Sequence, residues 1–202
     1  MAGRPREFDR DQALRQARDV FWQRGFEATS MADLVQALGI ASARIYAAFG
    51  SKEALFREAI ALYENGEGAF ADLALSEEPT ARAAIERMLR DAIELYTRPD
   101  GPLGCMVVSS ATNCTLDNDS IREWLAGHRR DRTRSIIQRL EQAVESGELP
   151  RQTPVQALGD CYATLLHGLS VQARDGIEQP RLLATLPMAL AVFDAAAGTS
   201  PA

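Results

Sequence analysis

The amino-acid sequence predicts an all-α protein, with an N-terminal helix-turn-helix unit followed by a larger helical part. Alanine and leucine dominate the composition, aromatic residues make up 6% of it, and extended runs of valine, isoleucine and threonine are absent, which favours helices over sheets. Apolar residues recur at helical spacing between glycine, proline and hydroxyl residues. With 202 residues the chain is long enough for a small domain joined to a larger one.

Two helices are expected in the first 39 residues. Residues 10–24 place their apolar side chains at helical spacing, and Gly25 is a natural stop. The second helix begins after Thr29 or Ser30, either of which can accept a hydrogen bond from its first turn, and ends at Gly39.

A third, very short helix is expected over residues 43–48, with Ser42 as its cap, and a fourth begins after Ser51. The third helix is too poor in large apolar residues to be a core helix. Ile45 and Phe49, four residues apart, can anchor one side of it, so the rest of the segment is left outward. Short helices joined by a glycine turn are typical of a helix-turn-helix.

The outward side of this third helix suits a duplex groove. Small residues let the backbone lie deep in the major groove, where Arg44 can pair with O6 and N7 of guanine. Tyr46 can donate to a phosphate oxygen, and Lys52 adds an ammonium group at a helix N-terminus, where free N–H groups also favour an anion. The alternative is an ordinary exposed corner with solvated cations. The cap, turn, small residues and cation occur in register, which favours double-stranded DNA.

Charge is distributed unevenly along the chain. The whole sequence carries −6, whereas residues 1–52 carry eight basic and six acidic side chains. A basic end on an acidic body suits a protein with one polyanion-binding surface. Arg4 and Arg6 precede the first helix, and such an arm either enters a minor groove or follows phosphates, or is only a solubilising tail.

Three stretches carry a family resemblance: RGFEATSM, LGI and IYAAFGSKEAL. Through them the first sixty residues resemble the N-terminal domain of the tetracycline-repressor family of bacterial transcription regulators. The resemblance implies a homodimer that binds a palindromic operator, represses a nearby operon and is released by a small-molecule effector in its C-terminal domain. It implies residues 1–50 as the DNA-binding domain and 51–197 as the effector-binding and dimerisation domain.

The same resemblance assigns individual DNA contacts by position. It implies phosphate contacts from Thr29, Tyr46 and Lys52, and base-facing positions at Ser42, Ala43, Arg44 and Ala47. The family often has a smaller threonine where this chain has Arg44, so a guanine is expected in each half-site.

The C-terminal part reads as further helices. They are expected from Pro79 or Thr80 to about Thr97, over 103–114, from Asp117 or Asn118 to Gly147, over 154–175, and over 181–196 with an interruption at Pro187. The last two carry more apolar surface than one contact face needs. Pairing with a second copy would bury that surface as a four-helix interface, although a wholly internal pair is the alternative.

An effector cavity is expected among the helix over 103–114, the long helix after it and the helix over 154–175. The candidate lining residues are Cys105, Met106, Ser109, Asn113, Trp124, His128, Tyr162, Leu166 and His167. Each of them is also an ordinary core residue in the simpler interpretation. Aromatic walls with a few polar groups suit a small, largely apolar effector.

Enzymatic and metal chemistry are not expected. The only two histidines, His128 and His167, do not stand in a metal-binding spacing, so no metal and no cofactor are predicted. The stretch NGEGAF, residues 65–70, is expected inside the fourth helix and lacks the preceding strand of a phosphate loop. No run approaches the ~18 apolar residues of a membrane span, and an apolar leader is missing at the N-terminus. The protein is expected to be soluble and cytoplasmic, without a membrane partner.

The cysteines leave one alternative open. Cys105, Cys114 and Cys161 form no even framework, which fits free thiols in a reducing compartment. Cys105 stands near the start of a predicted buried helix, where the pKa of a thiol can be lowered. The alternative function is therefore a thiol-based repressor that senses oxidants or electrophiles through Cys105, against the simpler view of Cys105 as a small buried residue.

Overall fold

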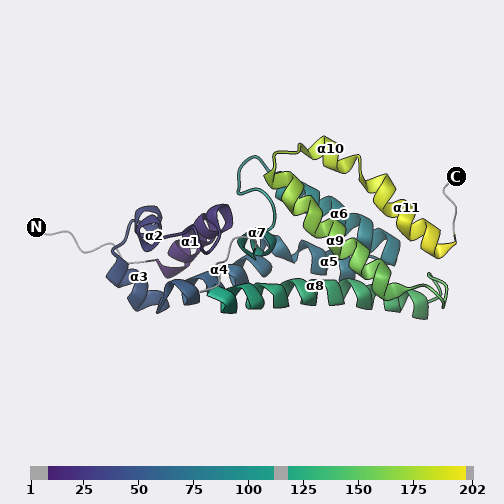
Figure 1. The fold of residues 1–202 in the computed structure, drawn as a ribbon, viewed down its shortest axis with the longest axis horizontal. Coiled ribbons are helices and arrows are strands. Elements are labelled where there is room, and N and C mark those ends of the chain that lie inside the picture. Colours follow the sequence, from purple (N-terminus) through teal and green to yellow (C-terminus); the bar gives the residue numbers. More distant parts are fainter. Residues whose placement is uncertain (1–8, 112–117, 199–202) are drawn as a thin grey trace, which may run out of the picture.

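The structure is a computed structural model that describes residues 9–111 and 118–198, and in these ranges its regular secondary structure is entirely helical (Figure 1). The elements are α1 (Arg10–Arg24), α2 (Met31–Leu38), α3 (Ser42–Phe49), α4 (Lys52–Glu64), a 3₁₀ turn η1 (Glu67–Ala69), α5 (Phe70–Glu77), α6 (Ala81–Tyr96), α7 (Met106–Ala111), α8 (Asp119–Glu145), α9 (Val155–Arg174), α10 (Gln179–Leu183) and α11 (Leu186–Ala197). The predicted all-α class is confirmed.

The elements are arranged along one long axis. Figure 1 shows α1, α2 and α3 at one end of the molecule, with α10 and α11 on the other side of the helical bundle that α5, α6, α8 and α9 form. Helix α4 leads from the first group toward the middle, where α7 lies. The structure therefore separates α3 from α11 by most of the length of the molecule.

The caps of the first helices follow the sequence closely. Ser30 begins α2 with a capping box, in which its hydroxyl accepts from the Asp33 N–H and the Asp33 carboxylate accepts from the Ser30 N–H. Gly39 ends α2 with φ of 66°, the left-handed conformation that glycine adopts without strain. The predicted first and second helices are confirmed, with Ser30 as the cap of the second.

The cap predicted for the third helix is wrong. Ala41, in an extended conformation, is the N-cap of α3 and makes no side-chain cap bond, whereas Ser42 is already inside the helix. The cap predicted for the fourth helix is confirmed, because the Ser51 hydroxyl accepts from the Ala54 N–H at 2.9 Å. Helix α3 is therefore fixed by what it packs against rather than by its own first turn.

Residues 65–70 were expected inside the fourth helix, and this is wrong. Helix α4 ends at Glu64, and the chain turns through η1 into α5. Glycine is required at Gly68, because a Cβ there would lie 2.7 Å from the ring of Tyr63. The turn brings the start of α5 back beside the end of α4.

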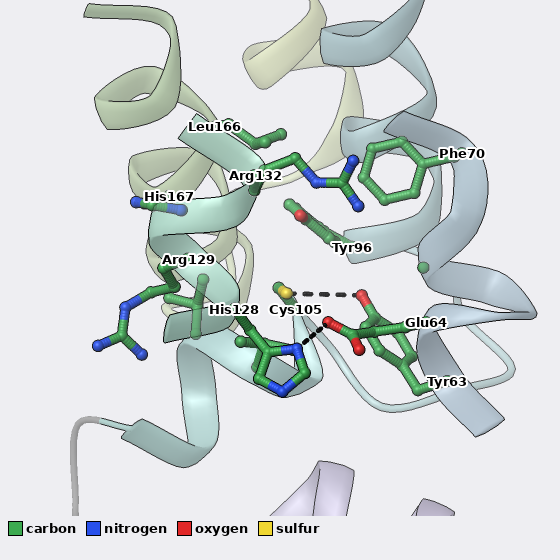
Figure 2. A pocket seen from close by; sticks show the side chains of 13 residues that line it. Tyr63, Glu64, Phe70, Tyr96, Cys105, His128, Arg129, Arg132, Leu166 and His167 are labelled. Carbon is green, nitrogen blue, oxygen red and sulfur yellow. Dashed lines mark hydrogen bonds and ion pairs between the residues drawn. The ribbon is translucent and has the colours of Figure 1, made fainter. Parts of the chain in front are cut away.

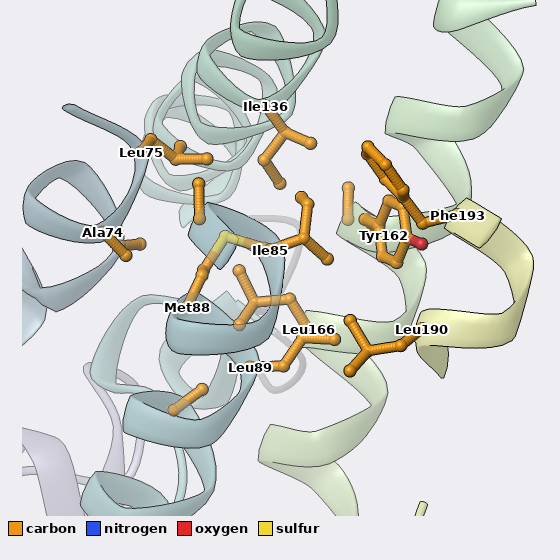
Figure 3. Packing of buried hydrophobic residues seen from close by; sticks show 14 of the residues in the cluster. Ala74, Leu75, Ile85, Met88, Leu89, Ile136, Tyr162, Leu166, Leu190 and Phe193 are labelled. Carbon is orange, nitrogen blue, oxygen red and sulfur yellow. The ribbon is translucent and has the colours of Figure 1, made fainter. Parts of the chain in front are cut away.

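Two clusters of buried apolar side chains fill the molecule. The first joins α1, α2, α3 and α4 with α7 and the start of α8, and includes Phe21, Phe56 and Met106. The second joins α5, α6, α8, α9 and α11, as in the packing of Ile85, Tyr162 and their neighbours in Figure 3. Helix α4 therefore shares its core with the N-terminal helices, although the predicted domain division stood at residue 50.

The C-terminal segment differs from the prediction in one respect. The last helix was expected to be interrupted at Pro187, but the interruption is a turn at residues 184–185. Pro187 lies in the first turn of α11, where the lack of a proline N–H costs little because that group has no helical partner. The stretch Gln179–Ala197 is apolar and long enough to cross a membrane by composition and length, but this turn divides it. Its exposed apolar side chains include Met188, 70% accessible.

Candidate nucleic-acid interface and cavity

Helix α3 presents one small, polar face to solvent. Ile45 and Phe49 are buried to 1% and 5% accessibility and hold the helix to the N-terminal cluster. Ala48, which was also predicted to face outward, is half-buried, whereas the other five residues predicted as outward-facing are exposed: Ser42, Ala43, Arg44, Tyr46 and Ala47. Their predicted exposure is confirmed, and this face stands at the end of the molecule (Figure 1).

The orientation of α3 is fixed by Arg10. The Arg10 guanidinium lies over the Phe49 ring, 4.5 Å from its centroid. It also donates to the Ala48 carbonyl at 3.4 Å and to the Glu58 carboxylate at 2.8 Å. Arg10 thus connects α1, α3 and α4, so the exposed face of α3 needs little ordering before it meets a partner.

Lys52 stands at the first residue of α4, just beyond the end of α3. Its Nζ lies 4.3 Å from the centroid of the Phe26 ring, a cation–π contact that holds the ammonium group in place. Partial burial lowers the pKa of Lys52, and the negative charges of Glu27 and Asp33 act against that shift. Lys52 is also the first residue of α4, and a helix N-terminus, like the ammonium group, favours an anion.

The phosphate contact predicted for Thr29 needs correction. Its side chain is fully buried, and its hydroxyl donates to the Gly25 carbonyl at 2.6 Å. This hydroxyl ties the turn between α1 and α2 and is not on the surface where a phosphate would lie. Arg4 and Arg6, the predicted arm, lie outside the described residues.

A cavity of about 50 Å³ opens where α4, α6, α8 and α9 meet the segment before α7 (Figure 2). Four of the predicted lining residues line it: Cys105, His128, Leu166 and His167. The lining residues that the sequence did not indicate are Tyr63, Glu64, Gly68, Phe70, Tyr96, Val107, Val108, Arg129 and Arg132. Most of these residues come from α4, α6 and α8. The prediction had placed α8 at the cavity but not α4 or α6.

The other predicted lining residues do not line this cavity. Met106 is buried in the N-terminal cluster, and Trp124 packs on Phe56 and His128 beside it. Tyr162 belongs to the second cluster, where its hydroxyl donates to the Ala189 carbonyl at 3.1 Å. Ser109 is buried within α7 and is absent from the cavity wall. Asn113 lies outside the described residues. The large apolar and aromatic side chains of Met106, Trp124 and Tyr162 were predicted to line a cavity, but in the structure they pack in the hydrophobic core.

The Cys105 thiol lies in the middle of the cavity wall, between two tyrosines (Figure 2). The Tyr63 hydroxyl donates to its Sγ at 3.5 Å, and the Cys105 N–H donates to the Ser170 hydroxyl at 2.8 Å. Burial raises the pKa of Tyr63 and of Tyr96 well above the usual value, and the neighbouring thiol adds to both shifts. Both phenols therefore stay protonated and able to donate.

The rest of the wall is more polar than the sequence indicated. His128 Nδ1 and the Glu64 carboxylate lie 2.8 Å apart, and Arg132 pairs with Asp72 at the surface. Burial lowers the pKa of His167, and the nearby charge of Arg129 lowers it further. The wall has the aromatic side chains that the sequence analysis expected, here Tyr63, Phe70 and Tyr96, and it adds charged groups that the sequence did not indicate.

The segment before Cys105 is also tied to the N-terminal helices. The Trp22 indole N–H donates to the Gly104 carbonyl at 2.9 Å, and the Arg98 guanidinium lies 4.6 Å from the centroid of the Trp22 ring system. From α9, Arg174 donates to the Trp22 carbonyl at 3.3 Å. The end of α1 is therefore in contact with the segment that carries the cavity's thiol.

Metal ligands do not gather in the described part of the chain. Over residues 9–111 and 118–198, no group of three or more histidine, cysteine, aspartate or glutamate side chains is placed to hold an ion. In the cavity wall, Tyr63 is bonded to Cys105, Glu64 to His128, and Arg132 is paired with Asp72 at the surface.

Comparisons with known proteins find similarity along nearly the whole chain. Residues 13–59 match the family described as bacterial regulatory proteins, tetR family, and residues 79–175 match the tetracyclin repressor-like C-terminal domain. Two repressors of Escherichia coli (strain K12) are similar: the HTH-type transcriptional repressor ComR is 34% identical over 90% of this chain and 87% of its own, and the HTH-type transcriptional repressor BdcR is 32% identical over 93% and 90%. Among solved structures, a cysteine mutant of the TetR family transcriptional regulator CifR, in complex with 26-base-pair operator DNA, is 41% identical over 93% of this chain and 98% of its own, with a TM-score of 0.88.

Proposed function

Because the chain belongs to the tetR family of bacterial regulatory proteins, we propose that it is a transcriptional repressor, which binds a palindromic operator as a homodimer and leaves it when an effector binds. The observation that carries the proposal is the exposed face of α3, anchored from behind by Ile45 and Phe49. CifR, which shares this fold over nearly its whole length, was solved on operator DNA. A DNA-binding repressor of this kind is a soluble protein that works in the cytoplasm, where the chromosome lies.

Within this proposal each exposed residue of α3 has a role. Arg44 reads a guanine in the major groove, with Ser42, Ala43 and Ala47 close to the bases because their side chains are short. Tyr46 and Lys52 contact phosphates, which fixes the register of the helix without reading sequence. Residues 1–50 supply these contacts, apart from that of Lys52 at the first position of α4, and 51–197 supply the effector and dimer contacts.

A homodimer follows from the surface of the C-terminal helices. Leu165 and Val171 on α9 and Met188 and Val192 on α11 are exposed apolar side chains, 37–70% accessible in the single chain. A second copy related by a two-fold axis would cover them. It would also supply a second α3, which one short helix needs for useful affinity to an operator with two half-sites.

The test is binding of the full chain to DNA from upstream of its own gene. Saturable binding, measured by fluorescence anisotropy, that is stronger than binding to a scrambled duplex of equal length is expected. Equal binding to both duplexes would reject the proposal. Sedimentation tests the dimer: Met188→Asp should shift the chain toward monomers, and Leu73→Asp, which alters an exposed leucine on α5, is the matched control.

One observation favours a second way of releasing the operator. The cavity reaches the Cys105 sulfur, and the Tyr63 hydroxyl donates to it, so an electrophile that enters the cavity meets a thiol beside a proton donor. With acrolein as the electrophile, whose size is close to that of acetate, the thiolate adds to the alkene, a C–S bond forms, and the adjacent carbon takes a proton from solvent. Operator release that tracks the adduct by mass spectrometry, and that Cys105→Ser abolishes while Cys161→Ser does not, is the expected result. Release without an adduct at Cys105 would exclude this route.

A further inference from the structure

The cavity gathers positive charge on one side. This charge comes from Arg129 and Arg132 on α8, while the lowered pKa of His167 on α9 leaves that imidazole neutral at pH 7. Among the described residues that line the cavity, Glu64 is the acid. A neutral apolar molecule would strip water from these groups and return no hydrogen bonds. An anion would be attracted by them, since the field of a partly enclosed cavity is screened less than that of an open surface.

We propose that this cavity binds a small organic acid, and that the carboxylate of the acid lies against Arg132 and the tyrosine hydroxyls beside Cys105. The proposal rests on the proposed function only where it treats this acid as the effector. The cavity volume of about 50 Å³ corresponds to roughly two water molecules, which suits an acid of about the size of acetate. Drug-sized ligands need several times that volume.

Arg132 is placed to receive a carboxylate. In Figure 2 its guanidinium points inward above Tyr96 and beside Phe70. Its present partner is Asp72, whose side chain is 61% accessible whereas that of Arg132 is 19% accessible. A carboxylate inside the cavity can use the same planar fork in a less hydrated position, and it competes only with an ion pair whose acidic partner is largely in water.

The tyrosine hydroxyls complete the site. Tyr63 now donates to the Cys105 sulfur at 3.5 Å, and a sulfur atom is a weak acceptor. The raised pKa of Tyr63 and of Tyr96 keeps both phenols protonated. A carboxylate oxygen is a stronger acceptor than the thiol, so each phenol gains a better hydrogen bond when the acid enters.

The acid would act on α4 through Glu64. Glu64 is the last residue of α4, and its carboxylate is bonded to His128 on α8 at 2.8 Å. A second carboxylate inside the same small cavity repels the negative charge of Glu64. The other end of α4 begins at Lys52, next to α3. Binding therefore favours an arrangement in which the end of α4 moves away from α8, and α3 moves with its other end.

Isothermal titration calorimetry on the full chain at constant ionic strength tests this site. The probes are sodium acetate, sodium propionate, inorganic phosphate and the neutral acetamide. Acetate or propionate should bind, whereas acetamide and phosphate should not. Arg132→Gln should weaken acetate binding by about tenfold or more. Arg130→Gln removes the same charge from the exposed side of α8, where Arg130 is 60% accessible, and should leave acetate affinity unchanged.

A third variant is expected to act in the opposite direction. Asp72→Asn frees Arg132 from its surface partner and should tighten acetate binding, an effect that loss of folding cannot imitate. Equal binding of acetate and acetamide, binding of phosphate alone, no binding at all, or equal loss in Arg132→Gln and Arg130→Gln would each overturn the inference. Operator affinity measured without acid for the same proteins keeps the two proposals apart: a chain that binds its operator but not acetate retains the proposed function and lacks this site.

Discussion

Replacing Lys52 with glutamine should change how salt weakens operator binding. Lys52 is the only lysine of the chain and stands at the start of α4, where its ammonium group is held over the Phe26 ring. If it neutralises one phosphate, a dimer loses two such contacts in Lys52→Gln. The slope of log affinity against log salt should then become shallower by about 1.8, at about 0.9 for each phosphate.

That change in slope has a measurable size. Between about 50 mM and 200 mM salt, the affinity advantage of the native chain over Lys52→Gln should shrink roughly twelvefold. The assay is a salt series of anisotropy titrations with a labelled operator. Arg151→Gln is the matched control, because it removes one exposed positive charge from the loop between α8 and α9. An unchanged slope in Lys52→Gln, or equal changes in both variants, would refute the phosphate contact.

Three further predictions concern the N-terminal helices. Arg44→Ala should cost about 1–3 kcal/mol on the operator and relax the preference at one base pair, which competition with singly mismatched duplexes measures; equal loss on matched and mismatched duplexes would contradict base reading. Ile45→Ala should lower the free energy of unfolding by about 2–5 kcal/mol in urea titrations. Tyr46→Ala, on the exposed face of the same helix, should change the free energy of unfolding by no more than about 0.5 kcal/mol. Similar losses in the two variants would mean that α3 is not anchored by Ile45. Hydrogen bonds from Ser30 hold the pKa of Asp33 at about 2, below the usual 3.8. The stability advantage of the native chain over Asp33→Asn should therefore be full above about pH 4 and disappear as the pH falls toward 2. An advantage that persists at the lowest pH would show that it does not come from the ionised Asp33 carboxylate.

The exposed face of α3 was largely predictable because it depends on local order. The exposure of Arg44 and Tyr46 follows from the positions of Ile45 and Phe49, since residues four apart lie on one face of a helix. The failures are also local in origin. Ser42 was expected to cap because its type suits a cap, but the backbone leaves the extended conformation one residue earlier. Thr29 is a residue type that contacts phosphates, yet its hydroxyl is used inside the turn.

The cavity was predicted only in part because it depends on contacts between distant segments. Cys105 and His167 were anticipated from their own helices. Tyr96 and Glu64 were not, because only the packing of α6 and α4 around the segment before α7 brings them there. Trp124 shows the reverse case: an aromatic residue near the cavity turns instead to Phe56 in the core. Periodicity states which side of a helix is buried but not which neighbour covers it.

The core that α4 shares with α1 limits the exchange of N-terminal helix-turn-helix domains between related regulators. Phe56 and Ile60 on α4 pack in one cluster with Met106, Ile121 and Leu125, which come from α7 and α8. A chimera joined at the turn between α3 and α4 would keep these side chains together but would place a foreign α1 against them. Fusion partners must therefore match the apolar surface of α1 as well as the length of the joint. Exchange of the exposed residues within α3 avoids the problem, because Ser42, Ala43, Tyr46 and Ala47 lie outside this core.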